Sequence, residues 1–147
     1  MSKNHQIFRE RLKESATALF IVAHYFHLRG FQLMIDGQHC AATASEHKKF
    51  ADTGDLSICY RGEWFGIEVK GLSTEFTNIK DWPHKNFMVC AKHSYDKRLP
   101  NPPARYYLLN KSRTHAAIVK TSTYPDWFVE TTKCGNYNNV SQDFYYC

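Results

Sequence analysis

Residues 55–70 carry two runs of alternating apolar and polar side chains on either side of Arg61-Gly62, and this pattern limits the fold more than any other. Alternation with a period of two is typical of β-strands that rest one face on a core. A residue pair containing glycine between two such runs favours a tight two-residue turn. The sequence therefore predicts a β-hairpin made of residues 55–60 and 64–70. Its apolar face comprises Leu56, Ile58, Phe65, Ile67 and Val69.

The other face of this hairpin carries two acids and a lysine. A two-residue turn pairs Tyr60 with Glu63, and the same register sets Asp55 opposite Glu68. Directly paired side chains on one face have Cβ atoms about 5 Å apart, and Lys70 projects from that face two residues further along. Adjacent carboxylates repel each other unless a cation lies between them. The cluster therefore predicts a site for Mg²⁺, a hard ion that prefers oxygen ligands.

The rest of the chain predicts a mixture of helices and strands. Residues 3–29 form an expected long helix, with an apolar stripe at spacings of three and four and Gly30 at its end. A strand is expected at 31–35 and a polar loop at 36–54. Further along we expect a short helix near 77–82, a loop at 99–103, and strands at 87–92, 105–110 and 116–120. The Asn- and Tyr-rich tail after Gly135 has no clear pattern.

Size and composition are those of one folded domain. The chain has 147 residues, of which 43% are hydrophobic, and this is enough apolar material for a core. No stretch approaches the ~20 apolar residues of a membrane span, and the polar start of the chain lacks a secretory signal, so the expected location is the cytoplasm, of the host if the protein is viral. Five cysteines without a C-x-x-C pair argue against a disulfide framework and a structural zinc site.

The positive charge is concentrated downstream of the hairpin. The chain has a net charge of +5, whereas residues 71–120 contain nine Lys/Arg against three Asp/Glu, a net of +6. A basic surface favours a polyanionic partner such as nucleic acid. Basic residues around an aromatic ring suit contact with phosphate and base together, although Trp82 is an equally good core residue. The candidate nucleic-acid-binding residues are Lys80, Trp82, Lys85, Lys92, Lys97 and Arg98.

Gly54-Asp55, twelve intervening residues and then Glu68-Val69-Lys70 resemble the signature of the PD-(D/E)xK nuclease superfamily. This superfamily includes restriction endonucleases, archaeal Holliday junction resolvases and many phage nucleases. The order of helix, strand, Asp-bearing strand and Glu-x-Lys strand also resembles its common core. The resemblance covers residues 3–92. It implies an α/β fold with a restriction-endonuclease-like core, in which a central mixed β-sheet carries the long N-terminal helix and flanking helices. We expect a single nuclease domain over 1–147, in which residues 93–147, to which the resemblance assigns nothing, form a basic C-terminal extension of the sheet.

The resemblance also implies a role for each matching residue. Asp55 and Glu68 would ligate Mg²⁺ or Mn²⁺ together with the backbone carbonyl of Val69. Lys70 would position or help to deprotonate the attacking water. Many members carry another metal-facing acid on the first helix. Glu14 is the candidate here, and it would need a rotated helix because it lies roughly 120° from the centre of the apolar stripe.

These observations lead to one main expectation and two alternatives. We expect a Mg²⁺-dependent endodeoxyribonuclease, structure-selective in the manner of a junction resolvase or a phage DNA-processing enzyme. DNA is the expected partner, with RNA as an alternative, no membrane contact, and a homodimer as a plausible assembly. Alanine at Asp55, Glu68 or Lys70 should then abolish most cleavage and leave the fold intact. The first alternative is a catalytically inactive nucleic-acid-binding module on the same fold, and the second is an interaction protein whose hairpin charges only face solvent.

Overall fold

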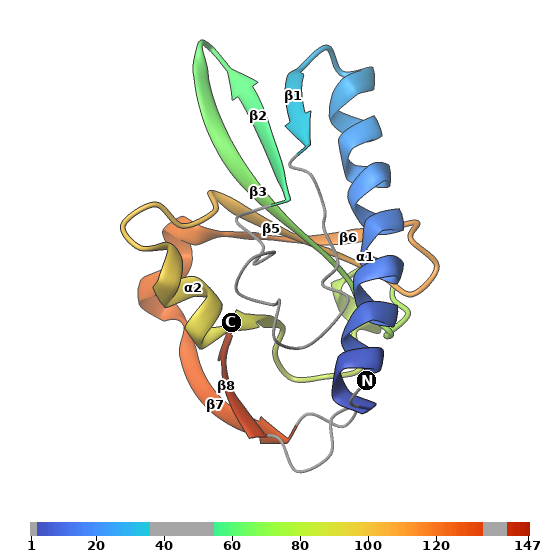
Figure 1. Ribbon diagram of the computed structural model, residues 1–147, viewed down its shortest axis with the longest axis vertical. Coiled ribbons are helices and arrows are strands. Elements are labelled where there is room, and N and C mark those ends of the chain that lie inside the picture. Colours follow the sequence, from blue (N-terminus) through green and yellow to red (C-terminus); the bar gives the residue numbers. More distant parts are fainter. Residues whose placement is uncertain (1–2, 36–54, 134–140) are drawn as a thin grey trace.

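The computed structural model describes residues 3–35, 55–133 and 141–147, and its α/β class is the expected one (Figure 1). A five-stranded mixed sheet has the order β1-β2-β3-β5-β6. Its neighbouring strands are antiparallel except for the parallel pair β3 and β5. The strands are β1 (Gln32–Ile35), β2 (Leu56–Tyr60), β3 (Glu63–Gly71), β5 (Arg105–Leu109) and β6 (Ala116–Lys120).

The long N-terminal helix is confirmed as α1 (Lys3–Leu28). It ends just before Gly30, the residue that was expected at its end. Gly30 has a φ of +80°, a conformation that glycine adopts without strain. The Gly30 N–H donates to the His27 carbonyl at 3.0 Å and the Phe31 N–H donates to the Phe26 carbonyl at 3.2 Å. The Phe26 and Phe31 rings meet edge to face, 5.5 Å apart. These contacts form a Schellman motif, which turns the chain directly into β1.

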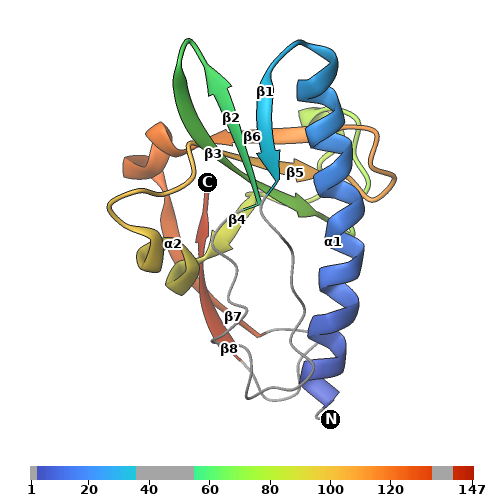
Figure 2. The same ribbon diagram turned by 45° about the horizontal axis from the view of Figure 1, so that its top comes forward.

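The hairpin of β2 and β3 has the predicted register, from Tyr60 opposite Glu63 to Leu56 opposite Ile67. Arg61 and Gly62 have φ values of +50° and +80°, as a tight turn between twisted strands requires. In Figure 2 the two strands lie beside β1 and the turn projects at the top of the molecule.

A second, three-stranded sheet was not foreseen. It has the order β4-β8-β7 and consists of β4 (Met88–Ala91), β8 (Ser141–Tyr146) and β7 (Phe128–Lys133). The expected strand at 87–92 therefore exists as β4 but belongs to this sheet, and the unassigned tail supplies its central strand. Lys92 begins a short helix, α2 (Lys92–Arg98), instead of ending a strand. The described residues also include two 3₁₀ helices: η2 (Ile79–Asp81), within the expected short helix, and η3 (Thr121–Asp126).

The five-stranded sheet lies between two cores. In Figure 1, α1 runs along one side of the molecule, and α2, β7 and β8 lie on the other. The predicted apolar face of the hairpin packs on α1 in a core formed by Ala18, Leu19, Val22, Ala23, Phe26, Leu56, Ile58, Ile67, Val69, Tyr107 and Leu109. The opposite face of the sheet contributes Tyr106, Leu108 and Val119 to a second core, which they form with Val89, Cys90, Tyr95 and Tyr145. Within the described ranges, no helix is long and apolar enough to cross a bilayer.

Candidate metal centre

Asp55 directly precedes β2 and accepts a hydrogen bond from the backbone of the neighbouring strand β3. Its side chain is only 6% exposed, and its Oδ2 accepts the Val69 N–H at 2.8 Å. The ladder between β2 and β3 ends at Leu56 and Ile67, and one further step of the same register sets Asp55 opposite Glu68. The Asp55 carboxylate is thus held next to the Glu68-Val69-Lys70 segment by a hydrogen bond to its backbone.

The same bond defines where the Val69 carbonyl points. In a β-ladder, the N–H and C=O of one residue project toward the same neighbouring strand. Because the Val69 N–H points to Asp55, the Val69 carbonyl oxygen projects to the Asp55 side of β3. The region where Asp55 meets β3 therefore combines the Asp55 carboxylate, the Val69 carbonyl and the adjacent Glu68.

Glu68 and Lys70 lie on the face of β3 that is turned toward the second core. Glu68 pairs with Tyr106 of the parallel neighbour β5, and Lys70 pairs with Leu108. Tyr106 is buried, and this burial raises the pKa of its hydroxyl, with the nearby Cys90 and Glu68 adding to the rise. Burial also raises the pKa of the Cys90 thiol, while the charge of Lys70 acts in the opposite direction. Lys70 and Glu68 thus stand at the margin of an apolar layer that limits solvent on this face.

An arginine from α2 contacts the acid of this motif. Arg98 Nη1 donates to Glu68 Oε2 at 3.0 Å, and the two side chains are 25% and 20% exposed. The guanidinium passes close to Gly66, where a Cβ would lie 3.5 Å from Arg98 Nη2, in ordinary van der Waals contact. Arg98 was expected on the nucleic-acid surface, and its contact with Glu68 was not predicted.

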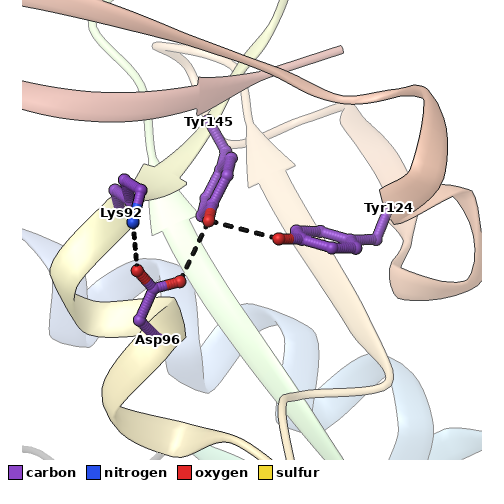
Figure 3. A network of polar contacts seen from close by, with 4 residues as sticks. All are labelled: Lys92, Asp96, Tyr124 and Tyr145. Atoms are coloured by element: carbon purple, nitrogen blue, oxygen red, sulfur yellow. Dashed lines mark hydrogen bonds and ion pairs between the residues drawn. The ribbon is translucent and has the colours of Figure 1, made fainter.

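A network of polar contacts holds α2 against the second sheet (Figure 3). Asp96 receives a charge-assisted hydrogen bond from Lys92 on one oxygen, and on the other it accepts the Tyr145 hydroxyl at 2.9 Å. The Tyr124 and Tyr145 hydroxyls are 3.3 Å apart. The hydrogen bond from Lys92 lowers the pKa of Asp96, and the same bond raises the pKa of Lys92. α2, which carries Arg98, is in this way attached to β8 and η3.

The remaining candidate nucleic-acid residues fall into two groups. Lys80 and Lys85 are exposed on the segment around η2, which follows the end of β3, and Lys97 is exposed on α2. Trp82 is half-buried: its ring stacks on Phe87 at 4.1 Å, and its Nε1 donates to the Asn86 carbonyl at 3.2 Å. Trp82 was interpreted either as a core residue or as a nucleic-acid contact, and these packing contacts favour the core residue. Lys92 is paired with Asp96 and is less available to phosphate than Lys80 or Lys85.

The donor set at Asp55, Glu68 and the Val69 carbonyl fits Mg²⁺. All three groups offer oxygen, and Mg²⁺ usually takes one or two carboxylates and keeps several waters. Among the residues that the structure describes, no group of three or more His, Cys, Asp and Glu residues gathers for a metal. The side chain of Glu14 lies outside the described part of α1, so the proposed helix ligand has no structural account.

The chain matches no protein-family model, and comparison with curated proteins and with solved structures finds no similar protein.

Proposed function

We propose that this protein is a metal-dependent endonuclease of the PD-(D/E)xK type that hydrolyses phosphodiester bonds in DNA. The observation that carries the proposal is the bond from the Val69 N–H to Asp55, which keeps a buried carboxylate beside Glu68 and Lys70. The order α1, β1, β2 and β3, with the aspartate directly before β2 and Glu-x-Lys near the end of β3, adds support.

The proposed chemistry is hydrolysis by water. The water oxygen forms a bond to phosphorus, the bond from phosphorus to the leaving deoxyribose oxygen breaks, and one water proton is lost while the leaving oxygen gains one. A bound Mg²⁺ would polarise the phosphate oxygens and lower the pKa of the water. Asp55 and Glu68 would hold the ion, and Lys70 would orient the water and offset the charge that develops on the phosphate. The apolar layer around Tyr106 strengthens these interactions by excluding bulk water.

An inactive nucleic-acid-binding module is the second candidate. The ion pair between Arg98 and Glu68 favours it, because a carboxylate that already neutralises an arginine needs no metal. In this second function the basic residues around η2 and α2 would bind phosphate and no bond would be broken.

Cleavage assays separate these functions. Purified protein is incubated with plasmid, linear, single-stranded and branched DNA in Mg²⁺, Mn²⁺ or EDTA. The nuclease proposal expects products with either metal and none in EDTA, and preference for the branched substrate would indicate a structure-selective enzyme. Binding without products in any metal would identify the inactive module. Neither binding nor products would leave the charged hairpin as a protein-interaction surface.

A further inference from the structure

The ion pair between Arg98 and Glu68 joins the candidate metal centre to an element outside the hairpin. Arg98 occupies the last position of α2, and its guanidinium reaches across Gly66 to the Glu68 carboxylate. Both side chains are about three-quarters buried, so water screens their charges only in part. The pair is therefore a substantial local interaction and not a solvated surface contact.

Charge balance gives this arginine a role in the absence of metal. The carboxylates of Asp55 and Glu68 lie on adjacent strands, where like charges oppose each other. Asp55 accepts the Val69 N–H, and Glu68 accepts the Arg98 guanidinium. A divalent cation bound between these carboxylates would add charge that Arg98 already supplies. Arg98 and the cation are thus competitors for Glu68.

The chemistry of the arginine fits a second partner. Guanidinium is a planar donor that binds phosphate as well as carboxylate in a bidentate manner. Arg98 keeps a quarter of its side chain exposed and lies next to the exposed Lys97 and Leu99. Rotation of its long side chain would move the guanidinium away from Glu68 and toward a phosphate bound beside this carboxylate.

We propose that Arg98 is a metal-responsive phosphate ligand: it neutralises Glu68 in the metal-free protein, gives up this carboxylate when a divalent cation binds, and then contacts the phosphate of the nucleic acid. This inference rests on the proposed function, since it takes Glu68 as a metal ligand. It assigns Arg98 a position in the substrate complex that a purely structural ion pair would not have.

Calorimetric titration of the full chain with Ca²⁺, without nucleic acid, tests whether Arg98 competes with the cation for Glu68. Arg98→Gln is expected to bind Ca²⁺ at least about fivefold more tightly than wild type, the lower end of coupling between two ligands that compete through one protein. Lys133→Gln removes the same charge from an exposed position on β7 and should bind Ca²⁺ as wild type does. Glu68→Gln should abolish binding. Circular dichroism confirms that each variant is folded.

Binding of a short DNA duplex in Ca²⁺ tests whether Arg98 contacts phosphate once the cation is bound. Arg98→Gln should weaken binding and flatten the dependence of log affinity on log salt by about one unit, the change expected for one lost phosphate contact. If Arg98→Gln does not fold, NMR of the arginine Nε–H groups in the wild-type protein provides the second measurement. The spectrum of Arg98→Lys lacks one of these signals and so identifies the signal of Arg98. The rate at which this Nε–H exchanges with water should change as Ca²⁺ saturates the protein.

Failure of this inference and failure of the proposed function give different results. If wild type binds Ca²⁺ through Glu68 but Arg98→Gln binds it no more tightly, or if the Arg98 signal stays unchanged in Ca²⁺, Arg98 is a structural clamp and this inference is wrong. If Glu68→Gln binds Ca²⁺ as wild type does, Glu68 is no metal ligand, and the proposed nuclease function fails with it.

Discussion

Asp55 has two roles at the residue scale, because one carboxylate both secures the strand and faces the proposed metal. Its Oδ2 bonds to Val69 in a buried position. The expectation that Asp55→Ala would leave the fold intact took account only of the catalytic role. The structure adds a buried N–H that alanine cannot satisfy.

Asp55→Ala should therefore lower the free energy of unfolding by about 1–3 kcal/mol, the cost of a buried donor without a partner. Asp55→Asn keeps an acceptor oxygen and should lose much less. Urea unfolding of wild type and both variants measures the difference. Equal stability of the alanine variant and wild type would show that the Val69 bond contributes little. Both variants should lack cleavage, which separates the structural role from the proposed chemical one.

At the element scale, the parts predicted from sequence are those with a periodic pattern. The apolar stripe of α1 and the alternating residues of β2 and β3 each mark one buried face. These three elements were predicted, together with the register between β2 and β3. α2 was missed because its sequence is polar throughout and buries only Tyr95. β8 was missed because its sequence has no clear alternation and because its place at the centre of a sheet depends on pairing with β4, far away in the chain. The contact between Arg98 and Glu68 follows from that packing, so no local pattern could reveal it.

The attachment of α2 should depend on pH. The pKa of Asp96 is lowered from its ordinary value of 3.8, so its contribution to stability is present above pH 4 and is lost as pH falls through the lowered value. Asp96→Asn should lower the urea midpoint at pH 7, and the gap to wild type should shrink below pH 4. Glu130→Gln, an exposed acid on β7, serves as the control. A gap that stays constant from pH 7 to pH 3 would contradict the role of the charged Asp96.

At the scale of the whole molecule, the nine Lys and Arg residues of 71–120 are spread over the η2 segment, α2, and β5 and β6 with the turn between them. Lys80 and Lys85 are exposed, whereas Lys92 and Arg98 are paired with acids. The exposed pair should therefore contribute more to the attraction of nucleic acid than Lys92 does.

Replacement of Lys80 and Lys85 by alanine should flatten the salt dependence of DNA binding by about two units, one for each lost contact, for all sequences alike. Lys92→Ala should have a smaller effect. Affinity is measured against salt concentration with Ca²⁺ in place of Mg²⁺, and Lys133→Ala is the charge-matched control. Equal slopes for wild type and the double variant would place the phosphate-binding surface elsewhere.

The central claim is that Asp55, Glu68 and Lys70 act as one metal-dependent hydrolytic unit. The most direct test is the single-turnover rate of DNA cleavage in Mg²⁺ for wild type, Glu68→Gln and Glu63→Gln, a variant of the exposed acid at the turn of the same hairpin. Glu68→Gln should be slower by at least about a hundredfold, and adding Lys70→Ala should slow it little further, because the residues act together. Glu63→Gln should cleave at the wild-type rate. A folded Glu68→Gln variant that cleaves within a few-fold of wild type would contradict the account.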